Sequence, residues 1–177
     1  MAMPLAAFTA RARRVRLLLF DVDGVLTDCS VTMGESGETK TFSIKDGAAL
    51  QWAKQSGLEV GFLSGRPSEA TTRRAKELGI DLVIQSPAPK RESFKTLIAS
   101  RGITAEEVAY MGDDLADLGV IAQVGLSAAP SDAAPEVLGR ASWVSSQPGG
   151  RGAVREFIEV VLRARNQWDT IVARQLE

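Results

Sequence analysis

The sequence contains no histidine, one cysteine and one tyrosine among its 177 residues. Without an imidazole, serine-histidine-aspartate hydrolysis, phosphohistidine chemistry and histidine-ligated zinc are all excluded. Cys29 has no partner for an internal disulfide, and Glu35 stands where a cysteine phosphatase would need an arginine. Carboxylates are therefore the side chains left to carry protons, and the single thiol fits a reducing compartment.

Two further absences narrow the class of protein. No apolar run approaches the ~20 residues that span a bilayer, and no glycine-rich run ends in the Lys-Ser or Lys-Thr of a P-loop. The 21 basic and 22 acidic residues nearly cancel, so there is no overall positive field to attract nucleic acid. We therefore expect a cytoplasmic protein that binds neither nucleic acid nor membrane.

The chain is long enough for one domain with a proper core and short for two. We expect a single domain over residues 1–177. Residues 1–16 carry four arginines and no acidic residue, which could indicate a weak transit-like segment. Such a segment would directly abut the first strand, so we favour a basic tail or a short helix.

An apolar run at 17–20 is followed by alternating apolar and polar residues over 30–44, around Gly34–Gly37, which is typical of a β-hairpin. The hydrophobic period then predicts helices that alternate with strands. The strands are expected at 59–63, 82–85, 108–111, 125–128 and 142–145, and the helices at 48–55, 68–78, 90–100, 115–121, 135–138 and from 154 onward. Alternating units of this kind predict an α/β fold, a three-layer doubly wound parallel sheet.

Polar residues gather where these strands end. Ligands of open α/β sheets bind outside the carboxyl ends of the strands, where main-chain amides can receive a phosphate. Two aspartates directly after a buried strand need a compensating cation, and several carboxylates around one position suit Mg²⁺. The residues expected at this edge are Asp21, Asp23, Ser64, Gly65, Arg66, Lys90, Gly112, Asp113, Asp114 and Asp117.

Each of these features also has an ordinary interpretation. An Asp-X-Asp triplet occurs in exposed turns, Ser64 could cap a helix, and Lys90 could be a solvated surface lysine. The segment 112–117 could be a capped turn. What favours a functional site is that all four features lie at one predicted edge of one sheet.

These residues resemble the four signature motifs of the haloacid dehalogenase superfamily of phosphohydrolases. Within it, Phe20–Asp28, Lys45–Gly47, Gly112–Leu118 and Gly149–Glu156 resemble the 3-deoxy-D-manno-octulosonate 8-phosphate phosphatases. The resemblance spans nearly the whole chain. It implies a Rossmann-like haloacid dehalogenase fold and a Mg²⁺-dependent phosphatase that supplies a sugar acid for lipopolysaccharide.

The resemblance also implies roles for single residues. Asp21 would be the nucleophile and Asp23 the general acid and base. Magnesium would be held by the carboxylates of Asp21 and Asp113 and by the main-chain carbonyl of Asp23, with Asp114 and Asp117 orienting metal waters or Lys90. Ser64, Gly65 and Lys90 would bind the phosphoryl group. The expected substrate-binding residues are Asp23, Lys45, Asp46, Gly47, Arg66, Arg74 and Arg151.

The substrate remains open between alternatives. Octulosonate phosphatases usually carry arginine where this chain has Lys45, and a lysine cannot grip a carboxylate with a planar fork. Phosphatases of nine-carbon ulosonate 9-phosphates, related to sialic acid, often show lysine there. A non-catalytic binding or scaffold domain is a second alternative, which the complete set of motif residues disfavours.

Larger members of the superfamily carry a cap domain, for which this chain has no room. Residues 28–46 and 65–90 each fall below the ~50 residues of a small domain. Selectivity would then come from a neighbouring subunit that closes over the site. We expect a homo-oligomer, a tetramer by the resemblance, in which hairpins form the centre and Arg151 reaches an active site, although residues 149–152 could be a plain glycine-rich turn.

Overall fold

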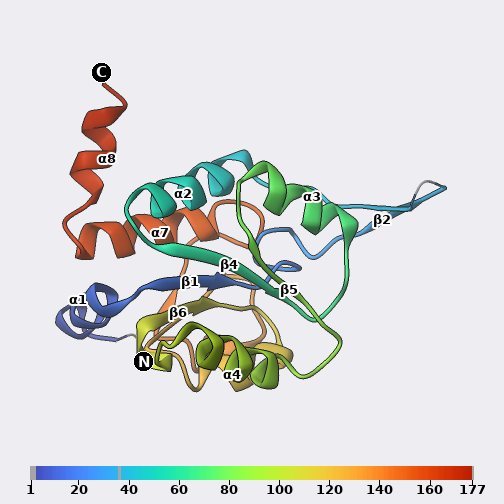
Figure 1. The fold of residues 1–177 in the computed structure, drawn as a ribbon, viewed down its shortest axis with the longest axis horizontal. Coiled ribbons are helices and arrows are strands. Elements are labelled where there is room, and N and C mark those ends of the chain that lie inside the picture. The colour runs from blue at the N-terminus through green and yellow to red at the C-terminus, as the bar shows by residue number, and fades with distance from the viewer. Residues whose placement is uncertain (1–2, 36, 177) are drawn as a thin grey trace.

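The computed structural model describes residues 3–35 and 37–176. Its centre is a parallel sheet with strand order β5-β4-β1-β6-β7-β8 (Figure 1). The strands of this sheet are β1 (Leu17–Phe20), β4 (Glu59–Ser64), β5 (Leu82–Gln85), β6 (Val108–Met111), β7 (Leu126–Ala129) and β8 (Trp143–Val144). This arrangement confirms the predicted three-layer doubly wound fold.

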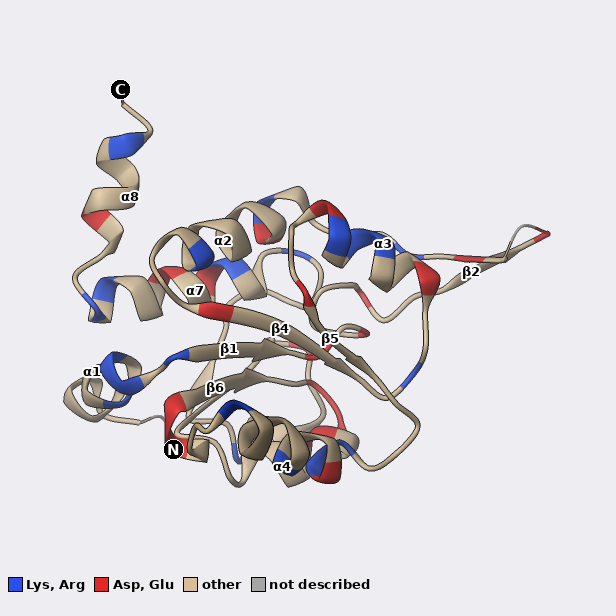
Figure 2. Ribbon diagram, viewed as in Figure 1, with Lys and Arg blue, Asp and Glu red and all other residues tan. Residues whose placement is uncertain are grey.

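Helices cover both faces of the sheet. Figure 1 shows α2 and α7 on one face and α4 on the other. The helices are α1 (Leu5–Arg14), α2 (Ile44–Gln55), α3 (Glu69–Glu77), α4 (Lys90–Arg101), α5 (Leu118–Ile121), α6 (Pro135–Leu138), α7 (Ala153–Ala164) and α8 (Trp168–Arg174), with short 3₁₀ turns at Ala105–Glu107 and Leu115–Asp117. Basic and acidic residues are interspersed along α2, α3, α4, α7 and α8, whereas α1 carries only basic ones (Figure 2).

Two hydrophobic cores lie on opposite faces of the sheet because side chains alternate along each strand. In β1, Leu18 and Phe20 belong to the core beneath α2 and α7, whereas Leu17 and Leu19 belong to the core beneath α4. All four are buried, as expected for a central parallel strand covered on both sides.

Strand β1 lies where the order of the sheet reverses. The chain passes from β1 to β4 on one side and later returns to β6 on the other. Phe20 is in register with Phe62 of β4 and with Met111 of β6. The residues that follow these three strands are therefore brought together at one edge, which is where α/β sheets bind ligands.

The predicted hairpin is present but shorter than 30–44. Strands β2 (Thr32–Gly34) and β3 (Gly37–Thr39) pair antiparallel with each other and project from the body of the molecule (Figure 1). Residue 36 lies outside the described residues. Both strands are largely exposed, and Met33 exposes 75% of its surface.

The prediction of one long C-terminal helix is wrong, because the chain forms two helices there. Helix α7 ends at Ala164, and Asn166 takes a left-handed conformation with φ 58° before α8 begins at Trp168. Trp168 is still buried, edge-on against Trp52 of α2. The apolar spacing therefore continues through the break and concealed it in the sequence.

Residues 5–14 form α1, with Phe8 and Ala12 buried in the core, in keeping with the short-helix interpretation of the basic segment. None of the helices over residues 3–35 and 37–176 is both long and apolar enough to cross a membrane.

Candidate active site

A cavity of about 200 Å³ lies at the carboxyl ends of β1, β4 and β6. Most residues predicted to carry the chemistry line it. The lining consists of Asp21, Asp23, Cys29, Ser64, Gly65, Arg66, Lys90, Asp113, Asp114 and Ala116. The structure thus brings together the four polar segments that the sequence places after separate strands.

Asp21 is the most firmly held residue of this cavity. Its amide donates to the carbonyl of Met111 at 3.0 Å, so it continues the β1–β6 ladder by one residue. Its Oδ1 accepts from the amide of Val22 at 2.7 Å, and its Oδ2 lies 2.7 Å from Lys90 Nζ. The carboxylate is buried but points into the cavity, a fixed position suited to a nucleophile.

Lys90, the first residue of α4, joins Asp21 to Asp117. Its Nζ donates to Asp117 Oδ1 at 2.6 Å, and the hydroxyl of Tyr110 donates to the same oxygen at 2.5 Å. Burial alone would lower the pKa of Lys90, but the two aspartates outweigh it and raise that pKa above its usual value. Lys90 is therefore a permanent positive charge beside Asp21.

Asp117 already has partners for both of its oxygens. Besides Lys90 and Tyr110 on Oδ1, the amides of Asp113 and Asp114 donate to Oδ2 at 2.9 and 3.1 Å. Asp117 thus fixes Lys90 and the acidic turn. Asp114 instead accepts from the amide of Leu115, and it is Asp117 that contacts Lys90.

The residues present fit a Mg²⁺ ion. Oxygen atoms of Asp21, Asp113 and Asp117 lie within 4.8 Å of one another. Asp113 Oδ1 is buried without a hydrogen-bond partner in the described chain. Burial, together with repulsion from neighbouring carboxylates, raises the pKa of Asp113 to about 8 and that of Asp21 to about 6. A crowded set of hard oxygen donors with surplus negative charge is what Mg²⁺ binds.

The glycine of the Asp-Val-Asp-Gly segment makes room for this acidic set. Gly24 has φ 86°, and a Cβ atom there would lie 1.9 Å from Asp113 Oδ2. Any larger residue would displace the carboxylate as well as strain the main chain.

Ser64 and Arg66 occupy the end of β4. The Ser64 hydroxyl accepts from the amide of Arg66 at 3.2 Å and donates to its carbonyl at 3.1 Å, which fixes the turn at the cavity wall. Arg66 Nη1 lies 2.7 Å from Glu38 Oε2, and its Nε lies 3.7 Å from Asp23 Oδ2.

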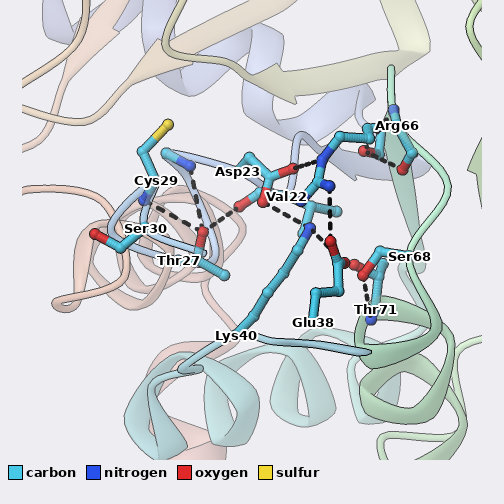
Figure 3. A network of polar contacts seen from close by, with 12 residues as sticks. Val22, Asp23, Thr27, Cys29, Ser30, Glu38, Lys40, Arg66, Ser68 and Thr71 are labelled. Carbon is cyan, nitrogen blue, oxygen red and sulfur yellow. Dashed lines mark hydrogen bonds and ion pairs between the residues drawn. The ribbon is translucent and has the colours of Figure 1, made fainter. Parts of the chain in front are cut away.

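Two charged residues of the hairpin also reach the site, and sequence reasoning missed both. Lys40 Nζ lies 2.7 Å from Asp23 Oδ1, and Glu38 contacts Arg66 and Lys40 (Figure 3). Their separation by two residues places them on one face of the hairpin. The sequence shows that these two residues share a face of the hairpin, but it does not show that this face turns toward Asp23.

Within the described chain, several predicted substrate contacts do not line the cavity. Asp46 is one of them: its two carboxylate oxygens accept from the amides of Gly152 and Arg155 and so cap the start of α7. Gly47 has no side chain, which allows Arg74 to approach closely: a Cβ atom at position 47 would lie 2.2 Å from Arg74 Nη2. Lys45 is exposed.

Arg74 and Arg151 lie outside the cavity lining of this chain. Arg74 donates to the carbonyl of Ser43 at 3.1 Å and pairs with Glu77, which ties α3 to the start of α2. Arg151 is 69% exposed and pairs with Asp28 at 3.4 Å. In the described chain, substrate contact by these two arginines stays a prediction that would require a second subunit.

Known proteins are similar to this chain over most of its length. Residues 38–125 match the family model of the haloacid dehalogenase-like hydrolases. The 3-deoxy-D-manno-octulosonate 8-phosphate phosphatase of Escherichia coli K12 is 42% identical over 161 residues, covering 90% of this chain and 86% of that protein. The Salmonella typhi phosphatase of the same name is 41% identical over 90% of this chain and 85% of its own length.

Solved structures agree with the fold as well. The corresponding Yersinia pestis phosphatase has a TM-score of 0.89 at 40% identity, covering 92% of this chain and 89% of that one. The Moraxella catarrhalis phosphatase, in complex with a magnesium ion, a phosphate ion and a KDO molecule, has a TM-score of 0.91 at 36% identity, with coverages of 94% and 96%. The chain belongs to the haloacid dehalogenase-like hydrolases and, among them, to the family of the 3-deoxy-D-manno-octulosonate 8-phosphate phosphatases.

Proposed function

We propose that this protein is a Mg²⁺-dependent phosphatase that converts 3-deoxy-D-manno-octulosonate 8-phosphate to the free sugar acid and phosphate, for lipopolysaccharide synthesis. The observation that carries the proposal is the buried Asp21 carboxylate, held by Lys90 beside Asp113 in a cavity at the end of β1. The identity of 42% with phosphatases of this name supports the choice of substrate.

The first step transfers the phosphoryl group to Asp21. An oxygen of its carboxylate attacks phosphorus, and the bond from phosphorus to the sugar oxygen breaks as the new bond forms. Asp23 gives a proton to the departing alkoxide oxygen. Lys90 and the turn at Ser64–Arg66 bind the phosphoryl oxygens where negative charge gathers.

The second step returns Asp21 to its free state. Asp23, now deprotonated, takes a proton from a water molecule, and the water oxygen attacks phosphorus. The bond between phosphorus and Asp21 breaks, and inorganic phosphate leaves.

A magnesium ion would be held by the carboxylates of Asp21 and Asp113 with the main-chain carbonyl of Asp23. When bound, it supplies positive charge that reduces repulsion between the phosphoryl oxygens and the attacking carboxylate. Asp117 keeps Asp113 and Lys90 in place for that purpose.

Rates of phosphate release test the proposal. The purified protein with Mg²⁺ should hydrolyse 3-deoxy-D-manno-octulosonate 8-phosphate far faster than hexose phosphates, and EDTA should stop the reaction. Equal rates on all sugar phosphates would contradict the substrate, and no release from any of them would contradict the activity.

The nine-carbon alternative rested on Lys45, which is exposed and lies outside the cavity lining of the described chain. The geometry of one subunit therefore gives no reason to prefer the nine-carbon substrate. Side-by-side rates with the eight- and nine-carbon phosphates decide between them.

We further propose a homotetramer, in which neighbouring subunits cover the open site. The exposed apolar side chains of Met33 and Ile44, on and beside the hairpin, support an interface there. A cytoplasmic location is also proposed, because Cys29 is a free, exposed thiol of the kind that reducing compartments maintain.

A further inference from the structure

The hairpin buries one lysine at its base. Strands β2 and β3 are largely exposed, but Lys40, the residue after β3, exposes none of its side chain. Its Nζ lies 2.7 Å from Asp23 Oδ1 and 3.9 Å from Glu38 Oε1 (Figure 3). A buried ammonium group is costly unless anions surround it, so this lysine requires the two carboxylates.

Asp23 in turn has a cation near each of its oxygens. Lys40 contacts Oδ1, and Arg66 Nε lies 3.7 Å from Oδ2. The two cations come from different elements, the hairpin and the end of β4. Together these two ion pairs favour one direction of the carboxyl group at the cavity wall.

Glu38 joins the two cations. Its Oε2 pairs with Arg66 Nη1 at 2.7 Å, while its Oε1 faces Lys40. A hydrogen bond from Ser68 and the charge of Arg66 lower the pKa of Glu38, so it remains an anion at neutral pH. The hairpin, the end of β4 and the start of α3 are thereby linked around Asp23.

We propose that Lys40 is a positioning residue for the proton transfer: its contact with Oδ1 holds the carboxyl group of Asp23 so that Oδ2, which carries the proton, faces the oxygen that leaves the substrate. Lys40 does not line the catalytic cavity in the described chain, and it reaches the reaction through Asp23. The inference rests on the proposed function, and it makes the hairpin part of the catalytic machinery as well as of an interface.

The leaving group distinguishes this role from a general structural one. A sugar alkoxide must receive a proton from Asp23 as it departs, whereas p-nitrophenolate leaves as a stable anion and needs none. General acid catalysis contributes roughly 10²- to 10⁴-fold. Loss of Lys40 should therefore slow phosphorylation of Asp21 by the sugar phosphate and spare phosphorylation by p-nitrophenyl phosphate.

The experiment is a rapid-quench measurement of the first turnover with both substrates. Lys40→Met, which keeps the length and removes the charge, should lower the phosphorylation rate from the sugar phosphate roughly 10- to 100-fold. The burst of p-nitrophenolate should stay within about threefold of wild type, because no proton transfer limits it. The substrate concentration that gives half the maximal phosphorylation rate should be unchanged, since Ser64 and Lys90 are intact.

Lys40→Arg should restore part of the rate with the sugar phosphate. Glu38→Gln should lower that rate less than Lys40→Met does and should likewise spare the rate with p-nitrophenyl phosphate. Lys95→Met removes an exposed lysine on α4 and should change neither substrate's rate. Thermal unfolding checks that each variant is folded, and if Lys40→Met is not, the arginine and Glu38 variants carry the test.

Equal losses with both substrates, or no loss with either, in folded variants would overturn the positioning role. Phosphate release by wild type from neither substrate would overturn the proposed function itself. The two failures are thus distinguishable.

Discussion

At the scale of single residues, the site contains more negative charge than its own lysine can balance. Lys90 contacts Asp21 and Asp117, while the buried Oδ1 of Asp113 has no hydrogen-bond donor in the described chain. The raised pKa values of Asp113 and Asp21, about 8 and about 6, follow first from burial and then from this crowding. An added divalent cation would offset this surplus.

Asp21→Asn should abolish turnover and leave the fold intact. Asparagine has almost the same shape, but its amide is too weak a nucleophile to attack phosphorus, so we expect a loss of at least about 10³-fold. Phosphate release measures the effect, and circular dichroism with thermal unfolding controls for folding. Undiminished activity in this variant would refute the assignment of Asp21 as the nucleophile.

The metal-free protein should lose stability as the pH rises. Folding raises the pKa of Asp113 from 3.8 to about 8, so between these values the folded state binds more protons than the unfolded state. The free energy of unfolding therefore falls with increasing pH in that window. Mg²⁺ binds the deprotonated carboxylates and should stabilise the protein more at pH 8 than at pH 5.

Thermal unfolding in EDTA and in Mg²⁺ checks this prediction. At a hundredfold excess over Kd the ion contributes about 2.7 kcal/mol, which raises Tm by roughly 5 to 10 °C in a protein of this size. Asp113→Asn is the control and should remove most of the pH dependence and of the Mg²⁺ effect. A Tm increase that is the same at both pH values would contradict the pKa shift.

At the scale of elements, the sequence predicts the sheet well because its strands are short buried runs between clear helix signals. Leu17–Phe20, Leu82–Gln85 and Val108–Met111 match their predicted bounds. The polar residues after β1, β4 and β6 could be predicted to meet, since parallel strands end at one edge. The local hydrophobic pattern was therefore sufficient to place those residues whose positions follow from the strands of the sheet.

Sequence reasoning failed where tertiary contacts decide. Lys40 and Glu38 lie on a hairpin whose direction follows from how it leaves β1, and no local pattern encodes that direction. Asp46 caps a helix that begins more than a hundred residues later, a structural role that no local pattern indicates. The break at Asn166 was hidden because Trp168 continues the apolar spacing.

Asp46→Ala should therefore affect stability and not catalysis. The change leaves the amides of Gly152 and Arg155 without acceptors, which should cost about 1–2 kcal/mol. Urea unfolding measures the cost, and kcat and KM should stay at wild-type values. Asp81→Ala, at an exposed aspartate outside the cavity, is the matched control. A raised KM in Asp46→Ala would restore its role in substrate binding.

At the scale of the whole molecule, the cavity lies at the carboxyl edge of the sheet, and the hairpin extends away from the body (Figure 1). Met33, in strand β2 of this projection, exposes 75% of its surface. Ile44, the first residue of α2, exposes 81%. Apolar side chains on an extended projection are typical of an interface between copies.

The double change Met33→Asp and Ile44→Asp should dissociate the proposed tetramer. Charged groups buried in an interface without partners are strongly unfavourable, so light scattering should report smaller species. Activity with the sugar phosphate should fall as the tetramer dissociates. Leu5→Asp, which changes an exposed apolar residue of α1, is the control and should leave the mass unchanged. An unaltered mass in the double variant would place the interface elsewhere.

The position of β1 has a consequence for local unfolding. β1 is hydrogen-bonded on both sides, to β4 and β6, whereas β2 and β3 pair with each other and join no other described strand. Main-chain amides of β1 should therefore exchange hydrogen at the rate of global unfolding, and those of the hairpin through frequent local openings. The carboxylate proposed to attack phosphorus is attached to the part of the molecule that should open last, and the lysine beside the proposed proton donor to a part that should open first.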